Sequence, residues 1–517
     1  MQIQETIRNS EQAISRQRMF ASVLPVAAFG CFAAALLVFT RHLFLDDAFI
    51  HLRIAQNLAA HGFFSFNGDI SSYSSSSPLY TSLLAFFWKL APTIYLPKAI
   101  GIVVYVALFY FVANLVIRSR EGAARICALS FLAVVSSPMA VRWLSDGMET
   151  GLVGLFALWL GRMTAYSYSR SFHFRPIVGC VMFALGLFAT LLRVEFAFLF
   201  ACVGFAWFVS CISVRKDMTW ERQSFWPSLY GAGGAVVGLW LIFLVFGNIL
   251  PDTAVAKQVS LEGKSFFSSA LQEGVDVAKA HASASFFGVA ALIVWSISSI
   301  LVCRSARARV FPLSLNFGLG FLVALIILRH QAVQGYRYFV FIEFFLIAFN
   351  IESLIRITTP RKSVSKHQVA FVTAAVFACV AWQWFDFTRL NIINAGRSSS
   401  FESFATGNLH DLAGKTGIAW DVGMIGFFSQ GHILDPNGLV DGRRFAAMSK
   451  HNRLREISSN GSIDFVFAND DQLGELSPYV NTSGWVEIGR FEFPNFGGNR
   501  DTHHLLVRAS ARSAQTE

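Results

Sequence analysis

Apolar segments long enough to cross a bilayer recur along the first three quarters of the chain, and they constrain its fold more than any other feature. A membrane-spanning helix needs about 20 mainly apolar residues, because the hydrocarbon core is about 30 Å thick. The pattern predicts an α-helical protein that crosses a membrane many times. The segments run approximately over residues 19–40, 78–92, 98–117, 123–142, 149–166, 176–192, 195–213, 228–250, 284–303, 309–328, 337–354 and 367–385.

The composition agrees with this class. Of 517 residues, 54% are hydrophobic and only 14% are charged, whereas soluble chains carry about 25% charged residues. The polar start of the chain and the length of the segment 19–40 exclude a cleavable signal peptide. The seven cysteines lie in or beside apolar segments and show no metal-ligand spacing.

The net charge of +10 arises from short loops between the apolar segments, and no continuous basic tract is present. This pattern excludes a nucleic-acid partner and follows the positive-inside rule, which places basic loops in the cytoplasm. The alternate loops then lie outside. The basic loops contain Arg118, Arg120 and Arg125; residues 162–175; Arg215, Lys216 and Arg222; Arg304, Arg307 and Arg309; and Arg356, Arg361, Lys362 and Lys366.

The number of crossings depends on one segment. If the N-terminus is cytoplasmic, 78–92 and 98–117 cannot both cross without moving a basic loop to the wrong side. Segment 78–92 is short, begins at Pro78 and contains Lys89 and Pro92. We expect it to be tilted, re-entrant or interfacial, which leaves about 11 crossings. The alternative is 12 crossings with one exception to the charge rule.

This topology gathers unusual polar residues on the outer face of a membrane module that comprises residues 1–385. A convergent polar set at one surface is typical of a catalytic cavity. The adjacent acids Asp46 and Asp47 begin a first outer loop, 41–77, and they serve either catalysis or helix capping. The other members of the set are Asp146, Glu149, Arg193, Glu195, Asp252, Lys257, Arg329, His330, Tyr336 and Arg337.

Within the first outer loop, residues 46–60 have the pattern of an interfacial helix. Ile50 and Ile54 fall on one side, and Asp46, Arg53 and Asn57 share a polar side. The serine-rich stretch that follows is either a flexible connector or part of the cavity.

Residues 386–517 are expected to form a separate small α/β domain outside the membrane. Strand patterns occur in KTGIAW, GHILD, DFVFAND and WVEIGRF, and helical patterns occur in GMIGFF and FAAMSKHNRLREI. The stretch DVGMIG lacks the dinucleotide-binding spacing. We expect the domain to bind an acceptor glycan or to close the outer cavity.

Five motifs, in order, resemble those of GT-C membrane glycosyltransferases. They are DDAFIHLRIAQNL with the following HG, FN and SSPLYTSLLA; GMETGL with RVE; NILPDTAVAK; GYRYFVFIEF; and AWDVGMIGFFSQGHILDPNGLVD. The pattern is most similar to the terminal arabinofuranosyltransferases of mycobacterial envelopes. Val194, Asp252 and the pair Phe427 and Phe428 depart from that pattern, so the resemblance does not extend to the identity of the sugar.

The resemblance implies a bacterial inner-membrane enzyme that moves a sugar from a polyprenyl-phosphate donor to a glycan or lipid acceptor. Asp46 would take the acceptor proton, and Asp47 would orient the acceptor or help to bind a divalent cation. Lys257, Arg329 and Arg337 would stabilise the leaving phosphate.

Structural readings compete at several of these positions. Arg329 and Arg337 are equally explained by snorkelling to lipid headgroups, and Arg193 with Glu195 is better explained as an ion pair. The further cavity candidates are Arg53, Asn57, Asp146, Glu149, Arg193, Glu195, His330 and Tyr336. Two other classes also stay open. They are a flippase or transporter of a lipid-linked saccharide, for which no internal repeat is present, and a non-catalytic envelope assembly protein.

Overall fold

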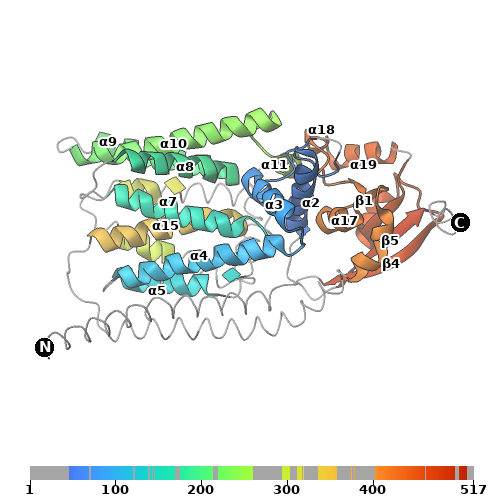
Figure 1. Ribbon diagram of the computed structural model, residues 1–517, viewed down its shortest axis with the longest axis horizontal. Helices are drawn as coiled ribbons and strands as arrows, with labels where there is room; N and C mark the ends of the chain where they lie inside the picture. Colours follow the sequence, from blue (N-terminus) through green and yellow to red (C-terminus); the bar gives the residue numbers. More distant parts are fainter. Residues whose placement is uncertain are drawn as a thin grey trace, which may run out of the picture.

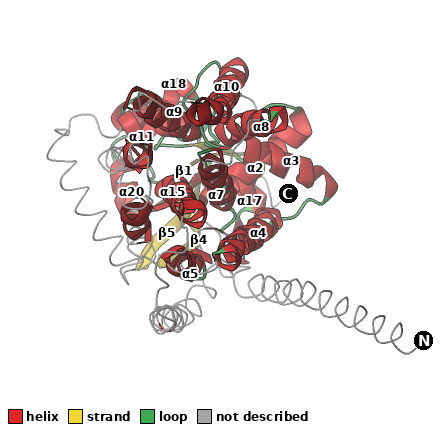
Figure 2. Cartoon of the chain, turned by 90° about the vertical axis from the view of Figure 1, so that its left-hand side faces the viewer, coloured by secondary structure: helices red, strands yellow, loops and turns green. Residues whose placement is uncertain are grey.

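The molecule has a bundle of long helices and a smaller α/β region built on one sheet, with helices α2 and α3 between them (Figure 1). Figure 2 shows the bundle helices nearly end-on. The computed structural model describes residues 46–68, 71–119, 123–137, 140–141, 144, 146–168, 175–213, 219–259, 294–302, 311–316, 318–319, 336–357, 374, 378, 401, 403–459, 462–494 and 500–508.

The bundle helices follow the apolar segments closely. Among the described residues, α4 and the stretch Phe225–Phe246 of α10 are long and apolar enough to cross a membrane, by length and composition. The bundle contains α4 (Leu96–Arg118), α5 (Ala123–Val135), α7 (Thr150–Ser167), α8 (Pro176–Leu192), α9 (Glu195–Ser213), α10 (Thr219–Phe246) and α15 (Tyr336–Ile357).

Several predicted segments differ in length from the observed helices: α5 ends at Val135 instead of residue 142, and α10 begins at Thr219 instead of residue 228. Helix α10 ends at Phe246 instead of residue 250, because Gly247 adopts φ +69°, the left-handed conformation that terminates helices. Helix α3 (Pro78–Leu90) has 13 residues and spans about 20 Å, less than the thickness of the hydrocarbon core of a bilayer. Its predicted tilted, re-entrant or interfacial position stays a prediction. Segments 19–40 and most of 367–385 lie outside the described residues, and 284–303 and 309–328 are described in part. The crossing number therefore stays a prediction.

Glycines bring α8 and α10 into close contact. A Cβ atom at Gly186 would lie 2.0 Å from the carbonyl oxygen of Gly231, and one at Gly234 would lie 2.0 Å from that of Phe183. Small residues at helix contacts are typical of membrane bundles, because they allow the backbones to approach.

Helix α2 (Asp46–His61) lies across the end of the bundle and packs against both α3 and α17 (Val422–Ser429). The interfacial position predicted for this helix stays a prediction, but the side that carries Arg53 and Asn57 does not face solvent. Arg53 is 6% exposed and Asn57 is 7% exposed, because the α/β region covers α2. Ile50 and Ile54 join an apolar core with Ile425 of α17.

The α/β region contains a five-stranded sheet of order β2-β1-β3-β5-β4. Strand β1 (Thr416–Ala419) pairs in parallel with β2 (His432–Leu434) and β3 (Phe465–Asn469), whereas β5 (Arg500–Arg508) pairs antiparallel with β3 and β4 (Trp485–Pro494). This region also contains helical residues 403–408, the 3-10 turn His410–Leu412 and helices α18 (Arg443–Ala446), α19 (Lys450–Ser459) and α20 (Asp470–Leu476).

The four predicted strands and both predicted helical stretches are present as β1, β2, β3, β4, α17 and α19, although the second stretch begins earlier than α19. Strand β5 was not predicted, because its first half, Arg500–His504, is polar. Those polar residues find acidic partners: His503 lies 3.1 Å from Asp421, and His504 lies 3.1 Å from Asp470. The predicted boundary at residue 386 falls outside the described residues.

Candidate active site

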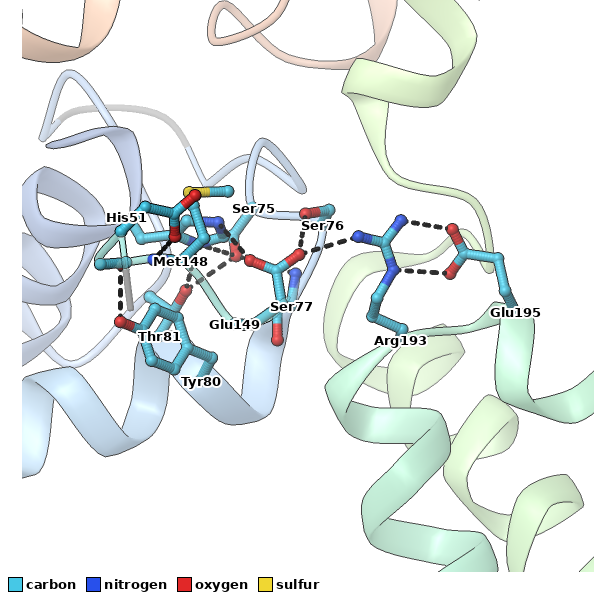
Figure 3. A network of polar contacts seen from close by, with 12 residues as sticks. His51, Ser75, Ser76, Ser77, Tyr80, Thr81, Met148, Glu149, Arg193 and Glu195 are labelled. Carbon is cyan, nitrogen blue, oxygen red and sulfur yellow. Dashed lines mark hydrogen bonds and ion pairs between the residues drawn. The ribbon is translucent and has the colours of Figure 1, made fainter. Parts of the chain in front are cut away.

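A buried carboxylate, Glu149, lies at the centre of a polar network at the sheet-facing end of the bundle (Figure 3). Its Oε1 accepts hydrogen bonds from Arg193 Nη1 at 2.9 Å and from Ser76 Oγ at 3.3 Å. Its Oε2 lies 3.3 Å from His51 Nε2. Glu149 immediately precedes α7, so the polar turn before an apolar helix places it at the bundle end.

The imidazole of His51 is held from both sides. Its Nδ1 lies 3.0 Å from Ser75 Oγ and 3.1 Å from Thr81 Oγ1, and the two hydroxyls are 2.7 Å apart. The serine-rich stretch is therefore not a flexible connector, because Ser75 and Ser77 are buried. Sequence reasoning missed His51, since a lone histidine on a helix carries little local signal.

Arg193 joins two acids. Its Nη2 donates to Glu195 Oε1 at 2.5 Å while Nη1 donates to Glu149. The expected ion pair of Arg193 with Glu195 is confirmed, and it extends to Glu149, which the sequence did not indicate. The neighbouring turn is held by Asp146, whose Oδ1 accepts from the Met148 amide at 2.9 Å.

Asp46 contacts the α/β region directly. Its Oδ2 accepts a hydrogen bond from the Gly423 amide at 2.9 Å, and Oδ1 accepts one from the Met424 amide at 2.7 Å. These amides begin α17, so Asp46 satisfies backbone donors that a helix N-terminus leaves open. A Cβ atom at Gly423 would lie 2.0 Å from the Asp46 carbonyl oxygen. Gly423 is therefore needed for this close approach of α17 to α2.

The surroundings of Asp46 favour its protonated form. Burial, followed by the nearby carboxylate of Asp421, raises the pKa of Asp46 to about 8, although the two amide donors oppose the shift. Asp47 also raises this pKa. Asp421 is oriented by His503, whose Nε2 lies 3.1 Å from Asp421 Oδ2. Asp46 and Asp47 thus share one electrostatic cluster with Asp421 of the α/β region.

Arg53 and Asn57 hold the turn that follows α2. Asn57 donates to the carbonyl oxygens of Ser65 at 3.0 Å and Phe66 at 2.8 Å, and Arg53 donates to Phe66 at 3.3 Å and to the side chain of Gln430. The structure brings both residues to this buried turn rather than to the Glu149 network.

A second link between the regions involves Asp252, at the start of α11 (Asp252–Val259). The Tyr73 amide donates to Asp252 Oδ2 at 3.0 Å, and the Asp252 amide donates to the Tyr73 carbonyl oxygen at 2.8 Å. Arg443 of α18 lies 3.9 Å from Asp252 Oδ1. Burial raises the pKa of Asp252, and Arg443 lowers it in part.

The predicted phosphate ligands are less fully described. Lys257 is half-buried in α11, Arg329 and His330 lie outside the described residues, and Tyr336 and Arg337 begin α15 with side chains that are not described. Another cation, Lys98, is fully buried at the start of α4. Sequence reasoning missed Lys98, although a lysine after Pro97 at the start of an apolar helix was an available signal.

The described residues contain no group of three or more His, Cys, Asp or Glu side chains that could hold a metal ion. A divalent cation at Asp46 and Asp47 therefore stays a prediction from the resemblance.

The overall fold is similar to that of ArnT from Cupriavidus metallidurans, a GT-C glycosyltransferase. The structure of ArnT bound to undecaprenyl phosphate matches with a TM-score of 0.54 and 12% identity over 94% of this chain and 98% of that chain. The apo structure matches with a TM-score of 0.57 and 12% identity over 95% and 99%. The sequence matches no protein-family model and no curated protein. The predicted GT-C fold is confirmed, and at this identity the likeness shows the fold alone.

Proposed function

We propose that the protein is a membrane glycosyltransferase that moves a sugar from a polyprenyl-phosphate donor to a cell-envelope glycan or lipid. The observation that carries this proposal is the GT-C fold, which extends over nearly the whole chain and is shared with an ArnT structure that holds undecaprenyl phosphate. The motif order favours the arabinofuranosyltransferase-like branch of that class. The bacterial inner membrane, with the α/β region outside, is the proposed location.

Asp46 is the proposed general base. A base works best when its pKa is near the working pH, and the pKa of Asp46 is about 8. The amides of Gly423 and Met424 each donate to one carboxylate oxygen, so both oxygens keep a further lone pair that can accept the acceptor proton. Asp47 would orient the acceptor or a divalent cation.

The leaving phosphate needs cationic partners in a site of low polarity. Lys257, Arg329 and Arg337 are the proposed ligands. Their proposed role rests on the outer position that the charge rule assigns to their segments.

Substitution of Asp46 tests the enzyme hypothesis. In Asp46→Asn we expect the transfer rate to fall by about 10² or more, because general bases typically contribute 10²–10⁴-fold, while binding of the polyprenyl-phosphate sugar is retained. Asp411→Asn, at an exposed position, is the matched control and should transfer normally. Near-normal transfer by Asp46→Asn would remove Asp46 as the base. Absence of transfer from a panel of polyprenyl-phosphate sugars would contradict the proposed function.

Sidedness is tested separately. An alkaline phosphatase fused after the C-terminus should be active, and a green fluorescent protein fused there should be dark. The opposite result would place the α/β region in the cytoplasm and contradict the proposed location. Mass spectrometry of envelope glycans from cells with and without the gene would then identify the product.

A further inference from the structure

A second buried carboxylate, Glu352 of α15, lies at the end of the bundle remote from the sheet and is surrounded by three arginines. Arg118 donates to it with both terminal nitrogens, at 2.7 and 2.9 Å. Arg356 donates through Nε at 2.7 Å, and Arg162 Nε lies 3.5 Å away. Glu352 is fully buried. The three arginines come from α4, α7 and α15, which pack against one another (Figure 2).

The cluster carries more cations than Glu352 needs. One bidentate guanidinium, that of Arg118, already satisfies both oxygens of the carboxylate. Three guanidinium groups against one carboxylate leave a net charge of +2 (3 − 1). Arg162 and Arg356 contact Glu352 through Nε, and within the described part of the chain their terminal nitrogens form no hydrogen bond. The terminal N–H groups of Arg162 and Arg356 therefore remain available as hydrogen-bond donors to a ligand.

Aromatic rings orient these two guanidinium groups. The guanidinium of Arg356 lies 4.5 Å from the ring centroid of Tyr166, and that of Arg162 lies 5.4 Å from the ring centroid of Phe111. Such cation–π contacts hold a planar cation in place. The side chains of Arg118, Arg162 and Arg356 are 29%, 33% and 24% exposed. The cluster is thus ordered by its neighbours and still reaches the surface.

The position of the cluster suits a lipid headgroup. Arg118 ends α4, and Arg356 lies next to the end of α15, where apolar helices of a membrane protein meet the headgroup layer. The dipole at helix C-termini stabilises one cation there without any ligand. The helix dipole does not explain why two further guanidinium groups lie beside Glu352, whose two oxygens already accept hydrogen bonds from Arg118.

We propose that the Arg118–Arg162–Arg356 cluster binds the phosphate of an anionic lipid headgroup in the leaflet opposite the α/β region. The planar forks of Arg162 and Arg356 match the oxygens of a phosphate diester, and basic pockets between membrane helices bind such headgroups. This inference rests on the membrane-spanning part of the proposed function and not on its catalytic part.

The test measures lipid binding by the full-length protein in neutral detergent, with phosphatidylglycerol and phosphatidylcholine as probes. We expect the wild type to bind phosphatidylglycerol more tightly. In R162Q/R356Q the affinity for phosphatidylglycerol should fall at least about tenfold, the effect expected when a charge-assisted contact is lost, while that for phosphatidylcholine is unchanged. R125Q removes an exposed arginine at the same bundle end and should have no effect.

Two further variants distinguish a lost ligand contact from a folding defect and from a simple loss of charge. R162Q alone leaves Arg118 and Arg356 on Glu352, so it provides a folded variant if the double variant fails to fold; it should weaken phosphatidylglycerol binding as well. R162K/R356K keeps the charge without the fork and should recover only part of the affinity. Equal affinity of the wild type for the two lipids, or full affinity in R162Q and R162Q/R356Q, would overturn the proposal. Inorganic phosphate that binds as tightly as phosphatidylglycerol would overturn the assignment to a lipid. No arm depends on glycosyl transfer, so a failure here is distinct from a failure of the enzyme hypothesis.

Discussion

Each end of the helical bundle contains a cluster of ion pairs between arginines and glutamates. Carboxylates outnumber guanidinium groups in one cluster, and guanidinium groups outnumber carboxylates in the other. At the sheet-facing end one guanidinium, that of Arg193, contacts two carboxylates, Glu149 at 2.9 Å and Glu195 at 2.5 Å. At the remote end one carboxylate, that of Glu352, is surrounded by three guanidinium groups. The first cluster has a charge of −1 (1 − 2), and the second has a charge of +2 (3 − 1).

This difference indicates different tasks. Acids in excess beside His51 and the serine hydroxyls suit recognition of hydroxyl groups and proton transfer. Cations in excess at the other end suit an anionic surface. The sheet-facing end is also covered by the α/β region, through the bonds of Asp46 to Gly423 and Met424. Such burial makes each charge there depend on its partner.

The largest expected effect follows from removal of Arg193, the guanidinium that contacts both Glu149 and Glu195. Arg193→Gln removes the guanidinium partner of the buried Glu149 carboxylate and leaves its contacts with His51 and Ser76. Loss of one partner of a buried ion pair costs about 3–5 kcal/mol, so the free energy of unfolding should fall by that amount. Titration with sodium dodecyl sulfate in micelles measures the change. A loss of unfolding free energy below about 1 kcal/mol would mean that the stability of this cluster does not depend on Arg193.

The next effect concerns the contact that sets the sheet-facing end apart. In Gly423→Ala the new Cβ would lie 2.0 Å from the Asp46 carbonyl oxygen and 2.9 Å from Oδ2. Overpacking of this kind costs about 1–3 kcal/mol, and transfer should fall because Asp46 moves. Unfolding and turnover are measured together. Gly474→Ala, in α20 with nothing within 4 Å, is the control and should keep both. Unchanged turnover in Gly423→Ala would show that α17 does not position Asp46.

A smaller effect should appear in the pH dependence. Asp421 raises the pKa of Asp46, so Asp421→Asn should lower that pKa. Because the base acts in its deprotonated form, the rise of kcat/KM with pH, expected near pH 8 in the wild type, should shift to lower pH in the variant. Asp470→Asn, which removes an exposed partner of His504, should leave the profile unchanged. A profile that is the same in Asp421→Asn and the wild type would separate Asp46 from the rate-limiting proton transfer.

The smallest effect on stability is expected at the remote end. Arg162→Gln removes the longest contact of Glu352, at 3.5 Å, from a side chain that is 33% exposed. Glu352 keeps Arg118 and Arg356, so the free energy of unfolding should change by less than about 1 kcal/mol. A change as large as that of Arg193→Gln would abolish the contrast between the two ends.

Much of the fold could be predicted from local patterns. The segments 176–192 and 195–213 coincide with α8 and α9, and KTGIAW and DFVFAND contain β1 and β3. The burial of Arg53 and Asn57 could not be predicted, because the α/β region that covers α2 comes from a distant part of the chain. Asp46 was singled out from the sequence, but its hydrogen-bond partners Gly423 and Met424 lie 377 and 378 residues along the chain. No local pattern indicates such a contact.

The sequence by itself determined the bundle helices α8 and α9 and the strands β1 to β4, and that acids precede some helices while arginines follow others. Hydrophobic length and alternation are properties of neighbouring residues, so a single chain displays them directly. Only the tertiary structure decided which charges meet. Glu149 lies with His51 and Arg193, and Glu352 lies with Arg118, Arg162 and Arg356. The energy of an ion pair depends on the distance between side chains and on their burial, and both are set by the packing of helices that are far apart in the chain.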